Sequence, residues 1–162
     1  MININGKDWL DATAEDVKIV LDTPEFEESF FFEFKSDQVS THTLAKEVSA
    51  LANTYGGYVF VGISDNTKDV EGCTRWNEER ILAVIHDTIT PIPVFDVRSF
   101  YIAGKCVIVL KVEEGAEPPY ITNRGEIYER ISSASCKITD SNRLSHLYSK
   151  NEKRLENNIK KI

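Results

Sequence analysis

The spacing of hydrophobic positions in the first 35 residues predicts a helix followed by a strand. An N-cap residue at Thr13 precedes acidic residues, and an apolar stripe then runs until Pro24, which is the pattern of a capped helix. That stripe consists of Val17, Val20 and Leu21. The aromatic segment 30–35 is too short for a helix and predicts a strand. Its period of two would place Phe30, Phe32 and Phe34 on one face and Phe31, Glu33 and Lys35 on the other.

The middle of the chain predicts two more helices around a buried strand. Leu44, Val48, Leu51 and Tyr55 recur at helical spacing before Gly56-Gly57, a typical helix end. The continuous apolar segment 58–63 predicts a strand buried on both faces, closed by a turn over 64–67. A helix from about Glu78 to Ile89 is expected to bury four apolar side chains and to end before the next prolines. Those four are Ile81, Leu82, Ile85 and Ile89.

The C-terminal half predicts further strands and a last helix. Segments 94–102 and 106–112 form a hairpin pattern, and 125–131 predicts another hairpin strand. From Asp140 the chain becomes helical and basic. We therefore expect an α+β fold with a mixed, mostly antiparallel sheet packed with helices. A chain of 162 residues suits one domain over 1–150, with 151–162 as a basic C-terminal helix or linker.

Composition is that of a folded globular domain, with 41% hydrophobic and 28% charged residues. The three cysteines are far apart and form no Cys-x-x-Cys pair, which argues against a disulfide framework and a zinc site. Neither a secretory signal nor a segment long enough to cross a bilayer is visible. We expect a cytoplasmic protein with no membrane partner.

The net charge of −7 argues against a uniformly basic binding face. Residues 1–33 contain nine acidic and two basic residues, whereas acids and bases balance in the remainder. Motifs for other chemistries are missing. No Gly-x4-Gly-Lys-Ser/Thr loop occurs, and the three histidines stand apart from any nucleophile elbow. P-loop nucleotide hydrolysis and Ser or Cys hydrolase activity are therefore disfavoured.

Four residues could together carry chemistry: Glu28, Glu33, Lys35 and Asp65. Glu33 and Lys35 share a strand face, Asp65 follows the second strand in a loop, and Glu28 could join them only from a bend or helix end. Three carboxylates can bind Mg²⁺ or Mn²⁺, and the ion with a lysine would stabilise charge on a phosphodiester. In the alternative interpretation, Glu28 is solvated, Glu33 pairs with Lys35, and Asp65 caps a turn.

Two segments carry a resemblance to a known family. Residues 28–35 and 48–65 resemble the Schlafen AlbA-type domain, and segments 70–73, 119–120 and 125–133 are similar to its later segments. The resemblance implies a single lobe of a nucleic-acid-binding fold. In animal Schlafen proteins this domain is a metal-dependent endoribonuclease acting on transfer and ribosomal RNA. The implied metal-binding roles fall on Glu28, Glu33 and Asp65, with Lys35 as the neighbouring base.

The same resemblance leaves a second function open. In microbial relatives the domain is commonly described as DNA-binding and is fused to regulatory or helicase-like parts, so a non-catalytic DNA- or RNA-binding module is the alternative. The candidate phosphate contacts are Arg124, Arg130, Lys137 and Arg143, with Tyr128 and Tyr148 for stacking, although ordinary surface charge explains them nearly as well. Animal Schlafen cores pair two lobes into a groove. A homodimer could rebuild that groove here.

Overall fold

A four-stranded sheet forms the centre of the protein. The computed structural model describes residues 3–24 and 30–160, with side chains up to residue 152. The strand order is β1-β2-β5-β4, and only β1 and β2 are parallel. These strands are β1 (Phe32–Lys35), β2 (Gly57–Val61), β4 (Phe95–Ile102) and β5 (Lys105–Val112). The expected α+β class with a mixed, mostly antiparallel sheet is confirmed.

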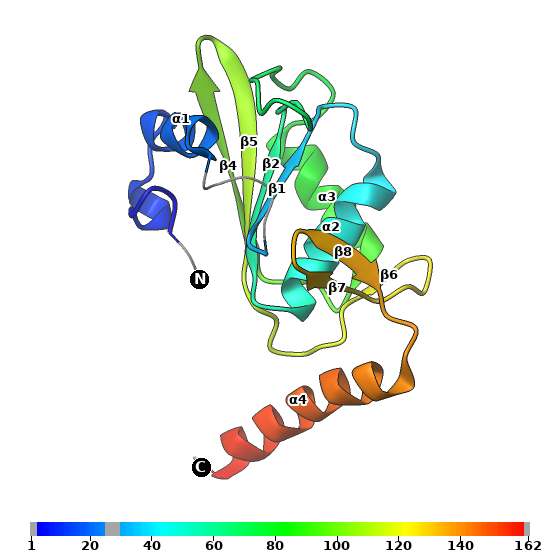
Figure 1. Cartoon of the computed structure of the whole chain (residues 1–162). Helices are drawn as coiled ribbons and strands as arrows, with labels where there is room; N and C mark the ends of the chain where they lie inside the picture. The colour runs from blue at the N-terminus through cyan, green and yellow to red at the C-terminus, as the bar shows by residue number, and fades with distance from the viewer. Residues whose placement is uncertain (1–2, 25–29, 161–162) are drawn as a thin grey trace.

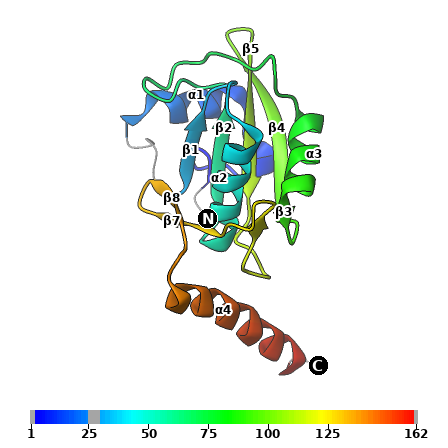
Figure 2. The ribbon, with the colours of Figure 1, turned by 90° about the vertical axis from the view of Figure 1, so that its right-hand side faces the viewer.

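Helices cover both faces of this sheet (Figures 1 and 2). The 3-10 helix η1 (Trp9–Asp11) and α1 (Ala14–Asp22) pack on one face, where Val17 and Val20 meet Phe32 and Phe34. On the other face lie α2 (Thr41–Asn53) and α3 (Glu78–Thr88). Thr13 caps α1 as expected, in a capping box with Asp16. Each face of the sheet therefore has its own apolar core, one shared with η1 and α1 and the other shared with α2 and α3.

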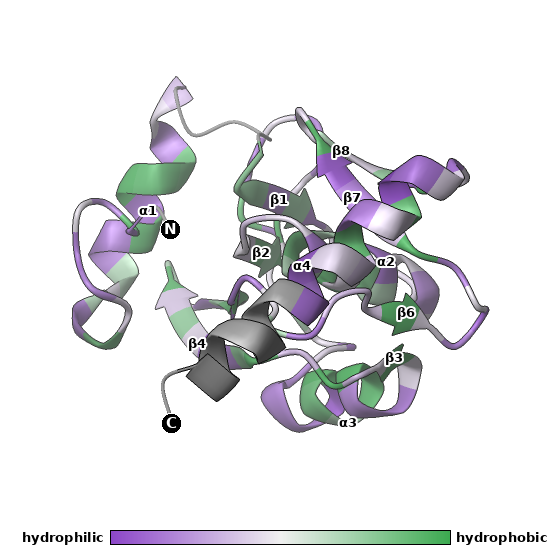
Figure 3. Ribbon diagram, turned by 90° about the horizontal axis from the view of Figure 1, so that it is seen from below, coloured by the Kyte–Doolittle hydropathy of each residue, from purple (hydrophilic) through white to green (hydrophobic). Residues whose placement is uncertain are grey.

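Smaller elements extend from the α2 side. Strand β3 (Ile89–Thr90) pairs with β6 (Ile121–Thr122), and β7 (Tyr128–Ile131) pairs with β8 (Ala134–Lys137) in a hairpin against α2. The last helix, α4 (Ser141–Lys160), runs below this body in Figure 1. Seen from below, its described half is mostly hydrophilic (Figure 3). None of the described helices has the length and apolar character that a membrane span requires.

The structure corrects several details of the predicted elements. Strand β1 begins at Phe32, so Phe30 does not share the buried face of Phe32 and Phe34. Helix α2 ends at Asn53 because Thr54 leaves the helical backbone conformation, and Tyr55 is 57% exposed. Leu82 is 43% exposed because α3 has only one buried stripe, which Ile81 and Ile85 fill. Strands β3, β6 and β8 were not predicted, since two to four residues carry too little periodicity.

Candidate functional site

Glu33 lies in a buried cluster of charges between β1 and the β7–β8 hairpin. Its side chain is 4% exposed, and that of Arg130 is fully buried. One carboxylate oxygen of Glu33 lies 2.9 Å from Lys35 Nζ, and the other accepts a hydrogen bond of 2.8 Å from Arg130 Nη1. Both oxygens of Glu33 therefore contact cations of the protein itself.

Glu47 of α2 completes this charge cluster. Arg130 Nη1 also lies 3.2 Å from Glu47, and the hydroxyl of Ser135 donates to Glu47 over 2.6 Å. One guanidinium is thus shared between two carboxylates. Burial, together with the negative charge of Glu33, raises the pKa of the Glu47 carboxyl above its ordinary value.

Alternation along β7 explains why Arg130 lies inside. Tyr128 and Arg130 are buried, whereas the neighbouring Ile131 is exposed. A buried charge is costly unless it is paired, so Arg130 fixes the hairpin against β1 and α2. Of the predicted contacts, Glu33 does pair with Lys35, as in the alternative interpretation. Arg130, predicted to contact phosphates, lies at 3% exposure.

Asp65 lies on the surface and not in the buried cluster. It is exposed in the loop after β2, where it lines a shallow pocket with Lys35 and the start of α2. Ser36, Ser40 and Thr43 belong to the same lining, but Glu33 does not. Lys35 is the residue that contacts Glu33 and also faces the pocket of Asp65.

The structure describes two of the three predicted metal ligands, Glu33 and Asp65. Glu28 falls outside the described part of the chain. Among the described side chains, in 3–24 and 30–152, no three His, Cys, Asp or Glu residues gather where they could hold an ion. The carboxylate of Glu33 is already neutralised by Lys35 and Arg130, so these residues do not fit a divalent cation as they stand.

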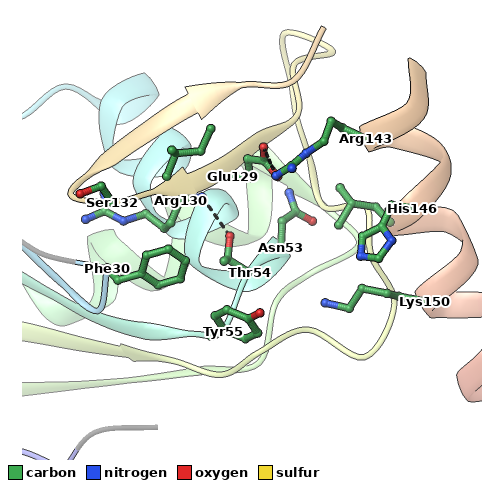
Figure 4. A pocket seen from close by; sticks show the side chains of 12 residues that line it. Phe30, Asn53, Thr54, Tyr55, Glu129, Arg130, Ser132, Arg143, His146 and Lys150 are labelled. Carbon is green, nitrogen blue, oxygen red and sulfur yellow. Dashed lines mark hydrogen bonds and ion pairs between the residues drawn. The ribbon is translucent and has the colours of Figure 1, made fainter. Parts of the chain in front are cut away.

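A second pocket, of about 290 Å³, lies between the end of α2, β7 and α4 (Figure 4). On one side Phe30 and Tyr55 form an aromatic pair, with ring centroids 5.6 Å apart and planes inclined by 33°. On the other side α4 presents Arg143, His146 and Lys150. The spacing i, i+3 and i+7 places these three side chains on one face of the helix. We call this space the α4 pocket.

Two carboxylates contact the basic side chains at the two ends of this face of α4, Arg143 and Lys150. Arg143 donates to Glu129 over 2.6 Å, and Lys150 lies 3.3 Å from Glu114. The Arg143 side chain remains 56% exposed and that of Lys150 35% exposed. Leu147, between them on α4, is 4% exposed and anchors the helix to the body.

The other predicted phosphate contacts, Arg124 and Lys137, are exposed near Glu126. A hydrogen bond from the Tyr128 hydroxyl, and then the nearby positive charges, lower the pKa of Glu126. The four predicted basic residues thus occupy three environments: near Glu126, the buried cluster and the α4 pocket. Sequence reasoning missed Glu47, Ser135, Tyr55, His146 and Lys150. Only the helical spacing of Arg143, His146 and Lys150 could have indicated a shared face.

Comparison with family models identifies the domain. The model described as Schlafen, AlbA_2 matches residues 28–139, well over half of the chain. The chain belongs to the Schlafen AlbA_2 family. This Schlafen AlbA_2 domain contains the Glu33–Arg130–Glu47 cluster within the matched residues, whereas α4 begins just after them.

Two solved structures share the fold of this Schlafen AlbA_2 domain. The DIP2311 protein of Corynebacterium diphtheriae is 22% identical with a TM-score of 0.61, over 75% of this chain and 25% of that protein. The N-terminal domain of a putative ATP-dependent DNA helicase RecG-related protein from Nitrosomonas europaea is 19% identical with a TM-score of 0.54, over 80% of this chain and 95% of that domain. The chain therefore spans about a quarter of the length of the Corynebacterium protein.

Proposed function

We propose that this domain binds nucleic acid on the face formed by the β7–β8 hairpin and α4. The observation that carries the proposal is the separation of charge across the sheet. The described part of the N-terminal segment, with η1 and α1 on one face of the sheet, carries five acids (Asp8, Asp11, Glu15, Asp16 and Asp22) against Lys7 and Lys18. The β7–β8 hairpin lies with α2 on the other face, and α4 runs below the body (Figures 1 and 2). A negative net charge is therefore compatible with a local surface that accepts phosphates.

The proposed face carries basic side chains that are exposed or, for Lys150, half-buried. They are Arg124, Lys137, Arg143, His146 and Lys150. Two of the acids between them are already engaged, since Glu126 accepts from Tyr128 and Glu129 accepts from Arg143. Family membership supports a nucleic-acid ligand, and the Nitrosomonas protein is named as a putative ATP-dependent DNA helicase RecG-related protein.

Charge reversal on each side of the sheet tests this proposal. We expect the double variant Arg124→Glu/Lys137→Glu to lower affinity for labelled DNA and RNA and to reduce the dependence of affinity on salt. The matched control, Lys7→Glu/Lys18→Glu, adds the same charge on the α1 side and should leave binding unchanged. Fluorescence anisotropy at low salt measures both. No binding by the wild type, or equal losses in both variants, would overturn the proposal.

A second candidate function is cleavage of structured RNA such as transfer RNA. It is favoured by the position of Lys35, which contacts Glu33 and lines the pocket that contains Asp65. We expect such cleavage to be lost in Asp65→Asn, and assays with and without Mg²⁺ or Mn²⁺ measure whether an ion takes part, since Glu33 as it stands is held by Lys35 and Arg130. Asp65 is exposed, so this variant should fold normally and separates catalysis from stability better than Glu33→Ala. Cleavage that persists in Asp65→Asn would exclude Asp65 from the reaction.

A homodimer remains part of the proposal, because two lobes would form a longer groove than one. Size-exclusion chromatography with light scattering, with and without RNA, measures the mass of the particle. A monomer under both conditions would show that one lobe acts alone.

A further inference from the structure

We infer that the α4 pocket takes one unpaired nucleotide of a single strand, with its base against Tyr55 and its phosphate against the cations of α4. The inference rests on the proposed nucleic-acid binding and specifies the class of ligand. The α4 wall of the pocket lies beyond residue 139, outside the family match, whereas the aromatic wall lies within it.

The aromatic wall suits a base. Tyr55 is 57% exposed, and the ring of Phe30 packs beside its ring at 5.6 Å between centroids. Tyr55 comes two residues after the end of α2, and α2 is packed in the core, so the helix fixes the position of Tyr55. A base that stacks on an aromatic side chain contributes about 1–3 kcal/mol, and every base offers a flat face for this contact.

The opposite wall suits a phosphate. Arg143, His146 and Lys150 lie along one face of α4, and Figure 4 shows them across the pocket from Phe30 and Tyr55. Glu129 holds only one terminal nitrogen of Arg143, and the guanidinium has further donors on a side chain that is 56% exposed. The bond to Glu129 also fixes the orientation of Arg143 before a ligand arrives.

The floor of the pocket has little hydrogen-bonding capacity left for a ligand. The Thr54 hydroxyl accepts from the backbone N–H of Arg130 and donates to the carbonyl of Ala50. Asn53 is 3% exposed and bonds the backbone of Tyr120 and Tyr128. Recognition therefore depends on the aromatic face and on the α4 cations. Such a pocket accepts any base and binds phosphates without reading sequence.

The geometry favours a single strand over a duplex. The bases of a duplex are stacked and paired, so their faces cannot reach an aromatic ring in a pocket, whereas unpaired bases can turn outward. Single-stranded DNA and single-stranded RNA both offer the base and the phosphate that this site would contact. The experiment therefore uses both DNA and RNA strands.

The test compares single strands with duplexes of the same sequence, using short fluorescein-labelled DNA and RNA and the full chain. We expect Tyr55→Ala to weaken single-strand binding by about 5- to 150-fold and to leave duplex binding unchanged. Tyr55→Phe keeps the ring and should bind as the wild type does. Tyr101→Ala removes a tyrosine that is 69% exposed on β4, away from the pocket, and should have no effect.

The outcomes separate this inference from the proposed function. Equal losses for single strands and duplexes in Tyr55→Ala, or no loss at all, would overturn the inference while the binding face stands. A wild-type protein that binds neither form would overturn both. Circular dichroism of Tyr55→Ala checks that the fold is kept, and Arg143→Ala/Lys150→Ala provides a second route, with an expected decrease in the salt dependence of single-strand binding.

Discussion

Arg130 Nη1 lies 2.8 Å from the carboxylate of Glu33, although the two residues are 97 positions apart in the chain. This contact joins the β7–β8 hairpin to the central sheet. Both partners were expected to face a ligand, Glu33 as a metal ligand and Arg130 at a phosphate. In the structure each faces the other, and Glu47 shares the same guanidinium.

Removing Arg130 should be strongly destabilising. Arg130→Met leaves Glu33 and Glu47 buried without their common cation, and breaking a buried pair from one side costs about 3–5 kcal/mol. Urea denaturation followed by circular dichroism measures the free energy of unfolding. Arg143→Met is the matched control, because its pair with Glu129 is exposed on the arginine side and should contribute at most about 1 kcal/mol. Equal losses in the two variants would contradict a structural role for the buried cluster.

Glu47 should make stability depend on pH. The pKa of its carboxyl is raised above the ordinary value of 4.5, so the folded state binds a proton more tightly than the unfolded state does. Its contribution to the free energy of unfolding is then complete below pH 4.5 and falls as pH rises through the raised pKa. Glu47→Gln keeps an oxygen that can accept from Ser135 and Arg130 and removes the titration.

The measurement for Glu47 is the difference in unfolding free energy between Glu47→Gln and the wild type, taken at several pH values. We expect this difference to shift in favour of the glutamine variant as pH rises through that window. A difference that stays constant with pH would show that Glu47 does not titrate as the structure indicates.

Asp37 should stabilise the loop that precedes α3. Its carboxylate accepts from the backbone N–H groups of Thr74, Arg75 and Trp76 over 2.9–3.1 Å. Burial acts to raise the pKa of Asp37, but these three hydrogen bonds outweigh it and lower the pKa below 3.8. The contribution of Asp37 to the free energy of unfolding is therefore present above pH 3.8 and is lost as pH falls through the lowered pKa.

Asp37→Asn should cost about 1.5–3 kcal/mol at neutral pH, because the amide nitrogen cannot accept and the charge is lost. The cost should shrink in acid, where the aspartate becomes protonated. Thermal unfolding at neutral and acidic pH measures this. Asp65→Asn, at an exposed position, is the control and should stay within about 0.5 kcal/mol of the wild type at neutral pH.

Asn53 should be essential for the attachment of β7 to α2. Its side-chain nitrogen donates to the carbonyls of Tyr120 and Tyr128, and its oxygen accepts from the Tyr120 N–H over 2.7 Å. Asn53→Ala leaves these buried backbone groups without partners, at about 1–3 kcal/mol for each group left unsatisfied. Denaturation in urea should show a loss above about 1 kcal/mol, whereas Asn66→Ala in the exposed turn should lie within about 0.5 kcal/mol. A loss no larger than that control would contradict the assignment.

Local pattern was sufficient for most of the fold. The cap at Thr13, the apolar stripe of α1 and the hairpin of β4 and β5 depend on residues close together in the sequence, and each is found where expected. Apart from Leu82 and the short strands, the predictions that were wrong lie at element ends. There, periodicity over one or two residues cannot decide whether Phe30 or Tyr55 still belongs to a strand or a helix.

By itself, the sequence determined the α+β class, the family and an acidic N-terminal segment, because these depend on composition, periodicity and contiguous motifs. Only the tertiary structure decided which charges meet. The local sequence around Arg130 suits a surface position and an interior position equally well, and the packing of β7 against β1 and α2 makes it interior. The α4 pocket likewise depends on residues near 55 and residues near 146 lining the same space, and no local spacing specifies that arrangement. Residues far apart in the chain become partners through tertiary packing. The free energy of burying a charge or exposing an aromatic ring depends on the groups that the packing places next to it.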